Sequence, residues 1–166
     1  MSAANEQPAF EQLELEIEGG EAEAQERYHA WGFGDGLPTG APTRERVERM
    51  CAGARHYALE SLGNLPPRGG AATIQKIAIN AVMAGCLPEH MPVLEAAVAA
   101  IQVSEFNLIG MQTTTHPCAL LAIVQGPVVG ALAMNAGHGC MGPGNRANSS
   151  IGRALRLILQ NVGGAI

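Results

Sequence analysis

The sequence predicts an α/β fold: a single domain with a short central sheet, flanking helices and a glycine-rich loop before the last helix. Amphipathic segments that begin with helix-capping residues alternate along the chain with short apolar runs typical of buried strands. The 166 residues are 47% hydrophobic and only 15% charged, against about 25% charged in ordinary globular proteins. This composition excludes a disordered chain or a coiled coil, and the length fits one domain with one core.

The first 30 residues are expected to form an acidic N-terminal arm, and residues 31–166 the α/β domain. Residues 1–27 hold eight of the fifteen acidic residues and a single base, Arg27. We expect a solvated arm. The alternation of apolar and acidic residues over 12–18 also fits an edge strand, with Leu13, Leu15 and Ile17 on one face.

Four segments have the pattern of helices. Thr43 is a suitable N-cap for the first, and apolar residues recur at helical spacing after it. Gly85 is a typical stop for the second, and Pro92 suits the first helical position of the third. The last is expected to stop at the pair of glycines that begins at Gly163. The predicted helices cover residues 43–62, 73–84, 92–102 and 149–160.

Three short, largely apolar runs favour buried strands between these helices. The first two cover residues 108–114 and 119–125, and a third strand is expected at 128–134.

The middle of the chain is poor in charge. Only five charged residues occur between Ser61 and Asn145, so this surface is expected to be covered in part by another subunit. The sequence also closes on apolar and glycine residues over 161–166, which favours a C-terminus that docks on a partner.

Charge and hydropathy exclude two classes of partner. The net charge of −5 argues against a nucleic-acid-binding protein, which needs a basic surface. No run of apolar residues is long enough to predict a membrane span, and the N-terminus lacks the pattern of a signal peptide. We therefore expect a cytoplasmic protein, in which cysteines pack, bind metal or react rather than form disulfides.

The most informative stretch is the glycine-rich segment 135–150. Its four glycines precede a helix, and backbone N–H groups at a helix start are suited to hold an anion. Arg146 adds a side chain that can grip a carboxylate or phosphate in bidentate fashion. The segment matches neither a Walker loop nor a dinucleotide-binding fingerprint. Ordinary turn chemistry remains the alternative.

Histidine and cysteine recur together three times, as Cys86 with His90, His116 with Cys118, and His138 with Cys140. Imidazole and thiolate are the ligands that Zn, Cu and Fe sites use, and a histidine beside a cysteine can also hold it as a thiolate. Alternatively, Cys86 is a small buried hydrophobe and the histidines cap turns. Glu89 is either an acid/base group with a raised pKa or a helix cap.

Several longer segments together resemble a known family. They are Gly34-Asp-Gly-Leu-Pro38, Pro42-Thr-Arg-Glu-Arg-Val47, the stretch 72–89 around Met83-Ala-Gly-Cys-Leu-Pro-Glu89, Phe106-Asn-Leu-Ile-Gly110, and Gly142-Pro-Gly-Asn-Arg-Ala-Asn-Ser-Ser-Ile-Gly-Arg-Ala-Leu-Arg156. The chain resembles the N-terminal half of a poorly characterised bacterial family associated with Sec/Cys-Gly-Ser-Cys motif (seleno)proteins, which are loosely described as thiol–disulfide proteins.

The resemblance covers nearly all of residues 31–164 and implies a partner, because members of that family continue into a second half. A second subunit is expected to supply that half. The matching positions are Lys76, Asn80, Cys86, Glu89, Arg146 and Asn148. The pairs His116/Cys118 and His138/Cys140 lie outside the family's pattern.

Together these observations predict a subunit of a heteromeric cytoplasmic enzyme, a lyase, hydrolase or oxidoreductase. It would act on a small anionic substrate by cysteine-thiol-dependent bond cleavage or redox chemistry. The expected catalytic residues are Cys86, Glu89, His116, Cys118, His138 and Cys140. The expected substrate-binding residues are Gly142, Gly144, Arg146, Asn148 and Ser149.

Two alternatives remain open from the sequence. One is a metal-dependent hydratase, hydrolase or lyase subunit that uses a transition metal (Zn, Fe or Cu) as cofactor. Its ligands would be His116, Cys118, His138 and Cys140. The other is a non-catalytic binding or assembly subunit, in which the glycines only form turns and the thiols only pack.

Overall fold

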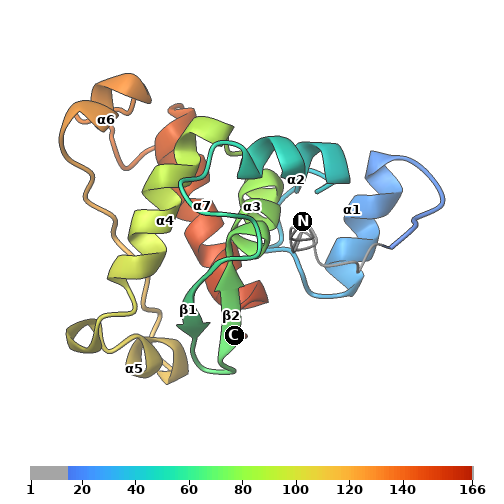
Figure 1. The fold of residues 1–166 in the computed structure, drawn as a ribbon, viewed down its shortest axis with the longest axis horizontal. Coiled ribbons are helices and arrows are strands. Elements are labelled where there is room, and N and C mark those ends of the chain that lie inside the picture. Colours follow the sequence, from blue (N-terminus) through green and yellow to red (C-terminus); the bar gives the residue numbers. More distant parts are fainter. Residues whose placement is uncertain (1–14, 166) are drawn as a thin grey trace, which may run out of the picture.

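The computed structural model describes residues 15–165 and has a mixed α/β composition, with helices and one two-stranded antiparallel sheet in this range (Figure 1). The α-helices are α1 (Glu21–Ala30), α2 (Arg44–Cys51), α3 (Ile74–Ala84), α4 (Met91–Ala100), α5 (Leu108–Thr113), α6 (Pro127–Ala131) and α7 (Arg146–Asn161). Two short 3₁₀ helices, η1 (Pro88–His90) and η2 (Ser104–Phe106), precede α4 and α5, and the strands are β1 (Ser61–Leu65) and β2 (Gly70–Thr73).

The core lies where α3, α4 and α7 pack side by side (Figure 1). Ile74 and Ile77 of α3 are fully buried, as are Leu94 of α4 and Leu157 and Ile158 of α7. Apolar residues at helical spacing account for these buried stripes. The packing of α3 against α7 aligns the C-terminal end of one helix with the N-terminal end of the other.

Helix α3 confirms its sequence prediction at both ends. The Thr73 hydroxyl accepts a hydrogen bond from the Lys76 N–H at 3.3 Å, and Gly85 ends the helix with a left-handed φ of 85°. Glycine adopts this conformation without the steric cost of a Cβ atom. Directly after it the chain turns into Cys86 and η1.

Helix α2 begins after Thr43, as predicted, but it ends at Cys51 and not near Leu62. The N–H groups of Gly53 and Ala54 close the last turn by donating to the carbonyls of Met50 and Cys51, both at 3.0 Å. The Arg55 N–H donates to the Glu95 carboxylate of α4 at 2.9 Å. The predicted helix extended to residue 62, but residues 61–65 form β1.

The strands predicted at 108–114 and 128–134 are wrong. Leu108–Thr113 is the short helix α5, and Pro127–Ala131 is α6. Short apolar runs fit a strand and a helix equally well, and the structure offers these runs no sheet to join. The sheet is a hairpin at one end of the helices, where Ser61 pairs with Thr73 and Leu65 with Gly70 (Figure 1).

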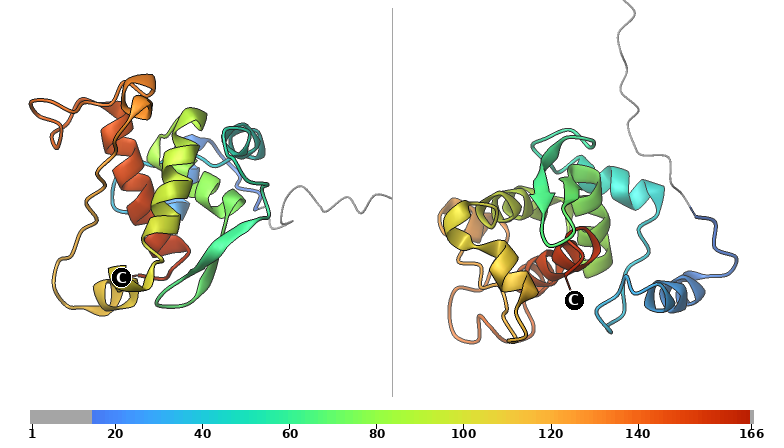
Figure 2. Two further views of the ribbon diagram at one scale, coloured as in Figure 1. Left: turned by 60° about the vertical axis from the view of Figure 1, so that its left-hand side comes forward. Right: turned by 90° about the horizontal axis from the view of Figure 1, so that it is seen from below.

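Residues 119–125, the remaining predicted strand, form neither helix nor strand. The chain from 114 to 126 runs extended along the outside of the molecule, from α5 to α6 (Figure 2). Leu121 and Ile123 on this segment are 68% and 77% exposed. The burial expected of a strand is therefore not achieved within one chain.

The N-terminal arm contains a helix, α1, which the sequence pattern did not predict. Glu21 at its start forms an ion pair with Arg46 of α2 at 2.9 Å. Residues 12–14 of the possible edge strand lie outside the described residues, and residues 15–18, with Leu15 and Ile17, belong to no strand. Within 15–165, no single helix is long and apolar enough to span a membrane; the one consecutive pair that is apolar enough together is bent by 78°.

Candidate functional site

The site is built where α3 ends and α7 begins. Helix α7 starts at Arg146, three residues before the predicted start, because the Asn145 side chain caps it by accepting the Asn148 N–H at 3.0 Å. This places Arg146 in the first turn. Its Nε donates to the Gly85 carbonyl at 3.0 Å, which joins the start of α7 to the turn that carries Cys86.

The Cys86 thiol is buried beneath this contact, with the residue 6% exposed. The Ser150 hydroxyl, one turn into α7, is near enough to act on the pKa of this thiol. Burial raises the pKa of the Cys86 thiol to about 11, although the Ser150 hydrogen bond and the Arg146 charge act in the opposite direction. At neutral pH the isolated group is therefore a thiol and not a thiolate.

The His90 imidazole completes the cluster and is 2% exposed. Its Nδ1 accepts the Leu87 N–H at 3.2 Å and lies 3.4 Å from the Ser150 Oγ. Burial lowers the pKa of His90; the Arg146 charge adds to this and the Glu89 charge opposes it. The imidazole is neutral near pH 7, with Nδ1 as an acceptor and its proton on Nε2.

Arg146 itself is exposed. Its Nε is engaged by Gly85, whereas its two Nη groups have no hydrogen-bond acceptor among residues 15–165. A guanidinium in this state keeps a pair of parallel donors available for a carboxylate or phosphate. The cluster thus presents a buried thiol next to an open cationic group.

The 135–145 loop leads into this cluster and is braced by Asn148. The Asn148 Nδ2 donates to the carbonyls of Asn135 and Cys140, both at 2.9 Å, and its Oδ1 accepts the Asn135 N–H at 3.1 Å. These contacts engage the polar atoms of Asn148 within the loop. Its side chain therefore uses both Nδ2 donors and one acceptor position of Oδ1 to hold the loop in place.

The remaining predicted substrate-binding residues lie at the surface near Arg146. Gly144 and Ser149 are exposed and Gly142 is half-buried. Gly144 has a φ of 109°, a conformation that favours glycine.

The other two His–Cys pairs are not brought to this cluster as a metal site. His116, Cys118, His138 and Cys140 are all exposed. Within residues 15–165, no three His, Cys, Asp or Glu side chains lie close enough together to hold a metal ion. The four predicted ligands therefore do not form one site within the chain, and a metal bound by them would need ligands from another chain.

Three further positions from the family resemblance have clear structural surroundings. The Asn80 amide is buried, donates to the Lys76 carbonyl at 2.8 Å and accepts from Asn161 at 2.7 Å. This joins α3 to the last turn of α7. Lys76 is half-buried on α3, and Glu89 is exposed on η1.

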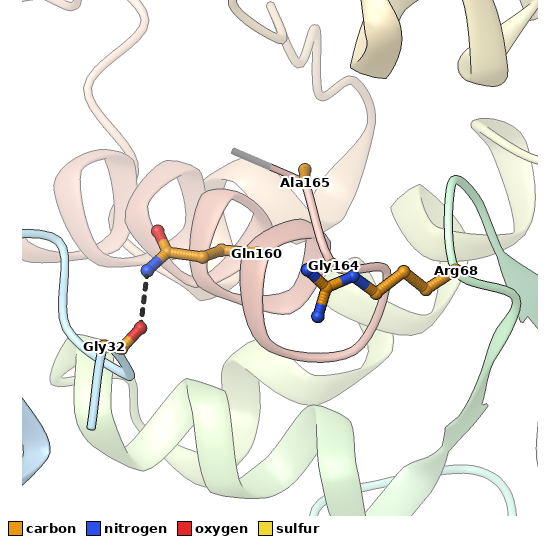
Figure 3. Close-up of a pocket in the computed structure, with 5 residues that line it drawn as sticks. All are labelled: Gly32, Arg68, Gln160, Gly164 and Ala165. Carbon is orange, nitrogen blue, oxygen red and sulfur yellow. Dashed lines mark hydrogen bonds between the residues drawn. The ribbon is translucent and has the colours of Figure 1, made fainter.

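A separate hollow of about 330 Å³ lies at the opposite end of α7. Figure 3 shows its lining: Gly32, Arg68, Gln160, Gly164 and Ala165. The Gln160 Nε2 donates to the Gly32 carbonyl at 3.0 Å. The lining contains no thiol, imidazole or carboxylate side chain.

Sequence reasoning identified Cys86 and Arg146 and paired Cys86 with His90, but it did not place His90 among the expected catalytic residues and gave Ser150 no site role. The Cys86–His90 spacing of four residues was a usable signal. The role of Ser150 depends on the packing of α7 on α3, which no local pattern reveals. Comparison of the chain with protein-family models, with curated proteins and with solved structures gave no match.

Proposed function

We propose that the chain is a subunit of a heteromeric enzyme that acts on a small anionic substrate by chemistry at the Cys86 thiol. The reaction class is thiol-dependent bond cleavage or redox chemistry, carried out by a single α/β domain over residues 31–166. One observation carries this proposal. Segments far apart in sequence converge to place a thiol, a hydroxyl and a neutral imidazole beside an arginine with open donors.

The charge of the substrate follows from Arg146. Its Nη groups are the only open cationic donors that the described residues place beside Cys86. A carboxylate or phosphate bound there would bring its neighbouring atoms to the thiol. The 135–145 loop, held by Asn148, would form the rim of this site and contribute backbone N–H groups.

The proposal gives different weight to the three cysteines predicted to be catalytic. Cys86 is assigned the reacting sulfur because only this thiol among them is embedded in a polar cluster. Cys118 and Cys140 are exposed thiols, and Cys118 serves as the internal reference in the experiment below. Glu89 is assigned an electrostatic role, since its charge acts on His90.

A second subunit is proposed to cover the uncharged side of the molecule. Residues 106–145 contain no Asp, Glu, Lys or Arg. Leu121 and Ile123 on the extended segment, and Met141 beside the site, are largely exposed. Apolar surface of this kind marks an interface. It reaches the rim of the Cys86 cluster at Met141, so a partner seated there would also restrict access of water to the thiol.

The substrate's charge can be tested without knowing its identity. The protein is treated with iodoacetate, an anion, or with iodoacetamide, its neutral analogue, and the modification of each cysteine is followed by peptide mass spectrometry. We expect the iodoacetate-to-iodoacetamide rate ratio at Cys86 to exceed that at Cys118. Substitution Arg146→Gln should lower the ratio at Cys86 by about tenfold, the equivalent of about 1.4 kcal/mol.

Arg156→Gln is the matched control, because Arg156 is an exposed arginine of the same helix. It makes the same change in net charge and should leave the ratio at Cys86 unaltered. Arg146→Lys should retain part of the preference, since the charge remains and the paired donors are lost. Equal ratios at Cys86 and Cys118, or a ratio at Cys86 that Arg146→Gln leaves unchanged, would contradict an anion site at this thiol.

A further inference from the structure

We propose that the hollow at the C-terminal end of α7 binds a free α-amino acid in its zwitterionic form. The hollow has a volume of about 330 Å³, which falls at the lower end of the range for small-ligand sites. It lies at the opposite end of α7 from Cys86, so this inference goes beyond the proposed function and does not depend on it. The hydrogen-bonding groups that the lining leaves open define the chemistry of the ligand.

Arg68 supplies the positive charge of the hollow, and the chain around it fixes its position. Its backbone N–H donates to the Gly163 carbonyl at 2.9 Å, which fastens the hairpin turn to the end of α7. Its aliphatic stem lies against the backbone of Gly164, where an added Cβ atom would come within 2.5 Å of the Arg68 Cδ (Figure 3). Gly164 has a φ of 74°, a left-handed conformation that also favours glycine. The Arg68 stem is therefore held at the edge of the hollow.

The guanidinium of Arg68 has no hydrogen-bond acceptor or ion-pair partner among residues 15–165. The other donors of the lining are all engaged. The N–H groups of Gly32, Gly164 and Ala165 donate to carbonyls of the described chain, and the Gln160 Nε2 spends both hydrogens on two further carbonyls. Arg68 thus holds the open donors of the lining, and their parallel arrangement matches a carboxylate.

The remaining open groups of the lining are acceptors. The Gln160 Oε1 and the Gly164 carbonyl accept no hydrogen bond from residues 15–165. Both belong to the C-terminal end of α7, where the helix dipole places partial negative charge and favours a positively charged donor. One guanidinium beside these acceptors fits a ligand that carries a carboxylate and an ammonium group together.

Neither group alone satisfies this lining. A simple anion would pair with Arg68 and leave the acceptors at the end of α7 without a charged donor. A simple amine would face the guanidinium with no carboxylate between the two positive charges. An α-amino acid carries both groups on one carbon atom, so each meets its own partner within a small volume.

Protection of Arg68 from 2,3-butanedione, a reagent that modifies exposed guanidinium groups, tests the site. The full chain is treated with the reagent, and the modification of each arginine is followed by peptide mass spectrometry. The probes are L-alanine, L-leucine and L-glutamine, which share the zwitterionic group and differ in the side chain. At least one should halve the rate at Arg68 at a concentration of about 1 mM or lower.

Arg49 is the internal reference in every sample. It is an exposed arginine of α2, and that helix contributes no residue to the lining. Its rate corrects for reagent that the free amino acid consumes, and the amino acid should not protect it.

Two analogues of the protecting amino acid test its two charges separately. Its carboxamide lacks the carboxylate, and the corresponding acid without the amino group lacks the ammonium. Each should require at least an about tenfold higher concentration for the same protection, because a hydrogen bond to a charged group is lost. Equal protection by the deaminated acid overturns the assignment of a zwitterion.

Gly164→Ala tests the position of Arg68 within the same assay. The added Cβ atom would displace the Arg68 stem, so the protecting concentration should rise by at least about tenfold. Gly69→Ala is the matched control. Gly69 has a similar left-handed φ of 71°, but a Cβ atom there would meet nothing within 4 Å. It imposes the same backbone strain next to Arg68 and should leave the protection unchanged.

Two results overturn the proposed site. One is the absence of selective protection of Arg68 by any of the three amino acids. The other is protection that Gly164→Ala and Gly69→Ala affect equally. Neither result alters the iodoacetate preference expected at Cys86, so the hollow and the proposed function stand or fall separately.

Discussion

Arg153 of α7 binds Asp35, 118 residues away in sequence, through two parallel hydrogen bonds of 2.8 Å. Arg153 also donates to the Leu37 carbonyl at 3.1 Å, and Gln160 donates to the carbonyls of Gly32 and Gly34. The segment 31–41 is thereby fastened along the helix whose first two turns carry the proposed site. The two motifs that these residues occupy in the family resemblance are in direct contact.

Breaking this pair should destabilise the fold. Arg153→Gln removes a largely buried bidentate pair, and we expect the free energy of unfolding to fall by about 1–3 kcal/mol. Urea denaturation at pH 7 measures it. Arg156→Gln, on the exposed face of the same helix, should change it by less than about 0.5 kcal/mol. Equal effects of the two substitutions would show that the Asp35 pair contributes nothing beyond net charge.

The stability of the chain should depend on pH through His56 and Glu95. The His56 Nδ1 contacts the carboxylate of Glu95, which is buried on α4. This hydrogen bond raises the pKa of His56, against the effect of burial. A histidine with a raised pKa binds its proton more tightly in the folded state. The stabilisation is therefore complete below about pH 6.5, the unfolded value, and is lost as pH rises through the folded value.

The measurement compares the thermal unfolding of the wild type and of His56→Gln at a series of pH values from below about 6.5 to the alkaline side. The difference in Tm should be largest on the acid side and shrink toward alkaline pH. His90 acts in the opposite sense, because its lowered pKa destabilises the fold as pH falls below about 6.5. Since both proteins contain His90, its effect cancels in the difference. A Tm difference that grows with rising pH would contradict the assignment.

Gly53 should be intolerant of a side chain. A Cβ atom there would lie 2.1 Å from the carbonyl oxygen of Pro88, the first residue of the short helix that carries His90. We expect Gly53→Ala to lower the free energy of unfolding by about 1–3 kcal/mol. Gly152→Ala is the matched control: a Cβ atom added there, on the exposed side of α7, would meet no neighbouring element within 4 Å, and alanine should stabilise that helix by about 0.5–1 kcal/mol. If both substitutions change the free energy of unfolding in the same direction, the close approach of Gly53 to Pro88 is not a feature of the fold.

The extended segment between α5 and α6 should govern association. Leu121→Lys with Ile123→Lys places charges on two exposed positions, so the free energy of unfolding should change by less than about 0.5 kcal/mol. We expect the unsubstituted chain, without the proposed second subunit, to form concentration-dependent assemblies at micromolar concentration, and the double variant to lose them. Analytical ultracentrifugation distinguishes these states. An unsubstituted chain that remains a monodisperse monomer would contradict the proposed interface.

The sequence predicted those parts of the fold that local chemistry determines. Thr73 and Gly85 bound α3 because a side-chain cap and a left-handed glycine act within a few residues. The apolar run at 108–114 carried no such signal and was misassigned, since a short apolar segment takes its structure from what surrounds it. Helix α2 was predicted too long because the contact that ends it, from Arg55 to Glu95, spans 40 residues.

The candidate site was predictable to a similar extent. Glycines and Arg146 before a helix indicated an anion site from local pattern alone. The association of Cys86 with Ser150 and His90 required the antiparallel packing of two helices, and the polar residues involved are buried in a way that composition does not reveal. The four-ligand metal site failed for the converse reason: similar spacing of His and Cys in two loops does not bring the loops of the described chain together.

The most direct test of Cys86 as the reacting sulfur compares two thiols of one molecule. Burial raises the pKa of both Cys51 and Cys86 to about 11, but the charge of Arg146 opposes this shift at Cys86, whereas the charge of Glu48 adds to it at Cys51. Cys86 is the more buried of the two. Peptide-resolved alkylation with iodoacetamide at neutral pH should modify Cys86 faster than Cys51, because the Arg146 charge stabilises the Cys86 thiolate and the Glu48 charge disfavours the Cys51 thiolate. Modification of Cys51 at an equal or higher rate would contradict the assignment of Cys86 as the activated thiol.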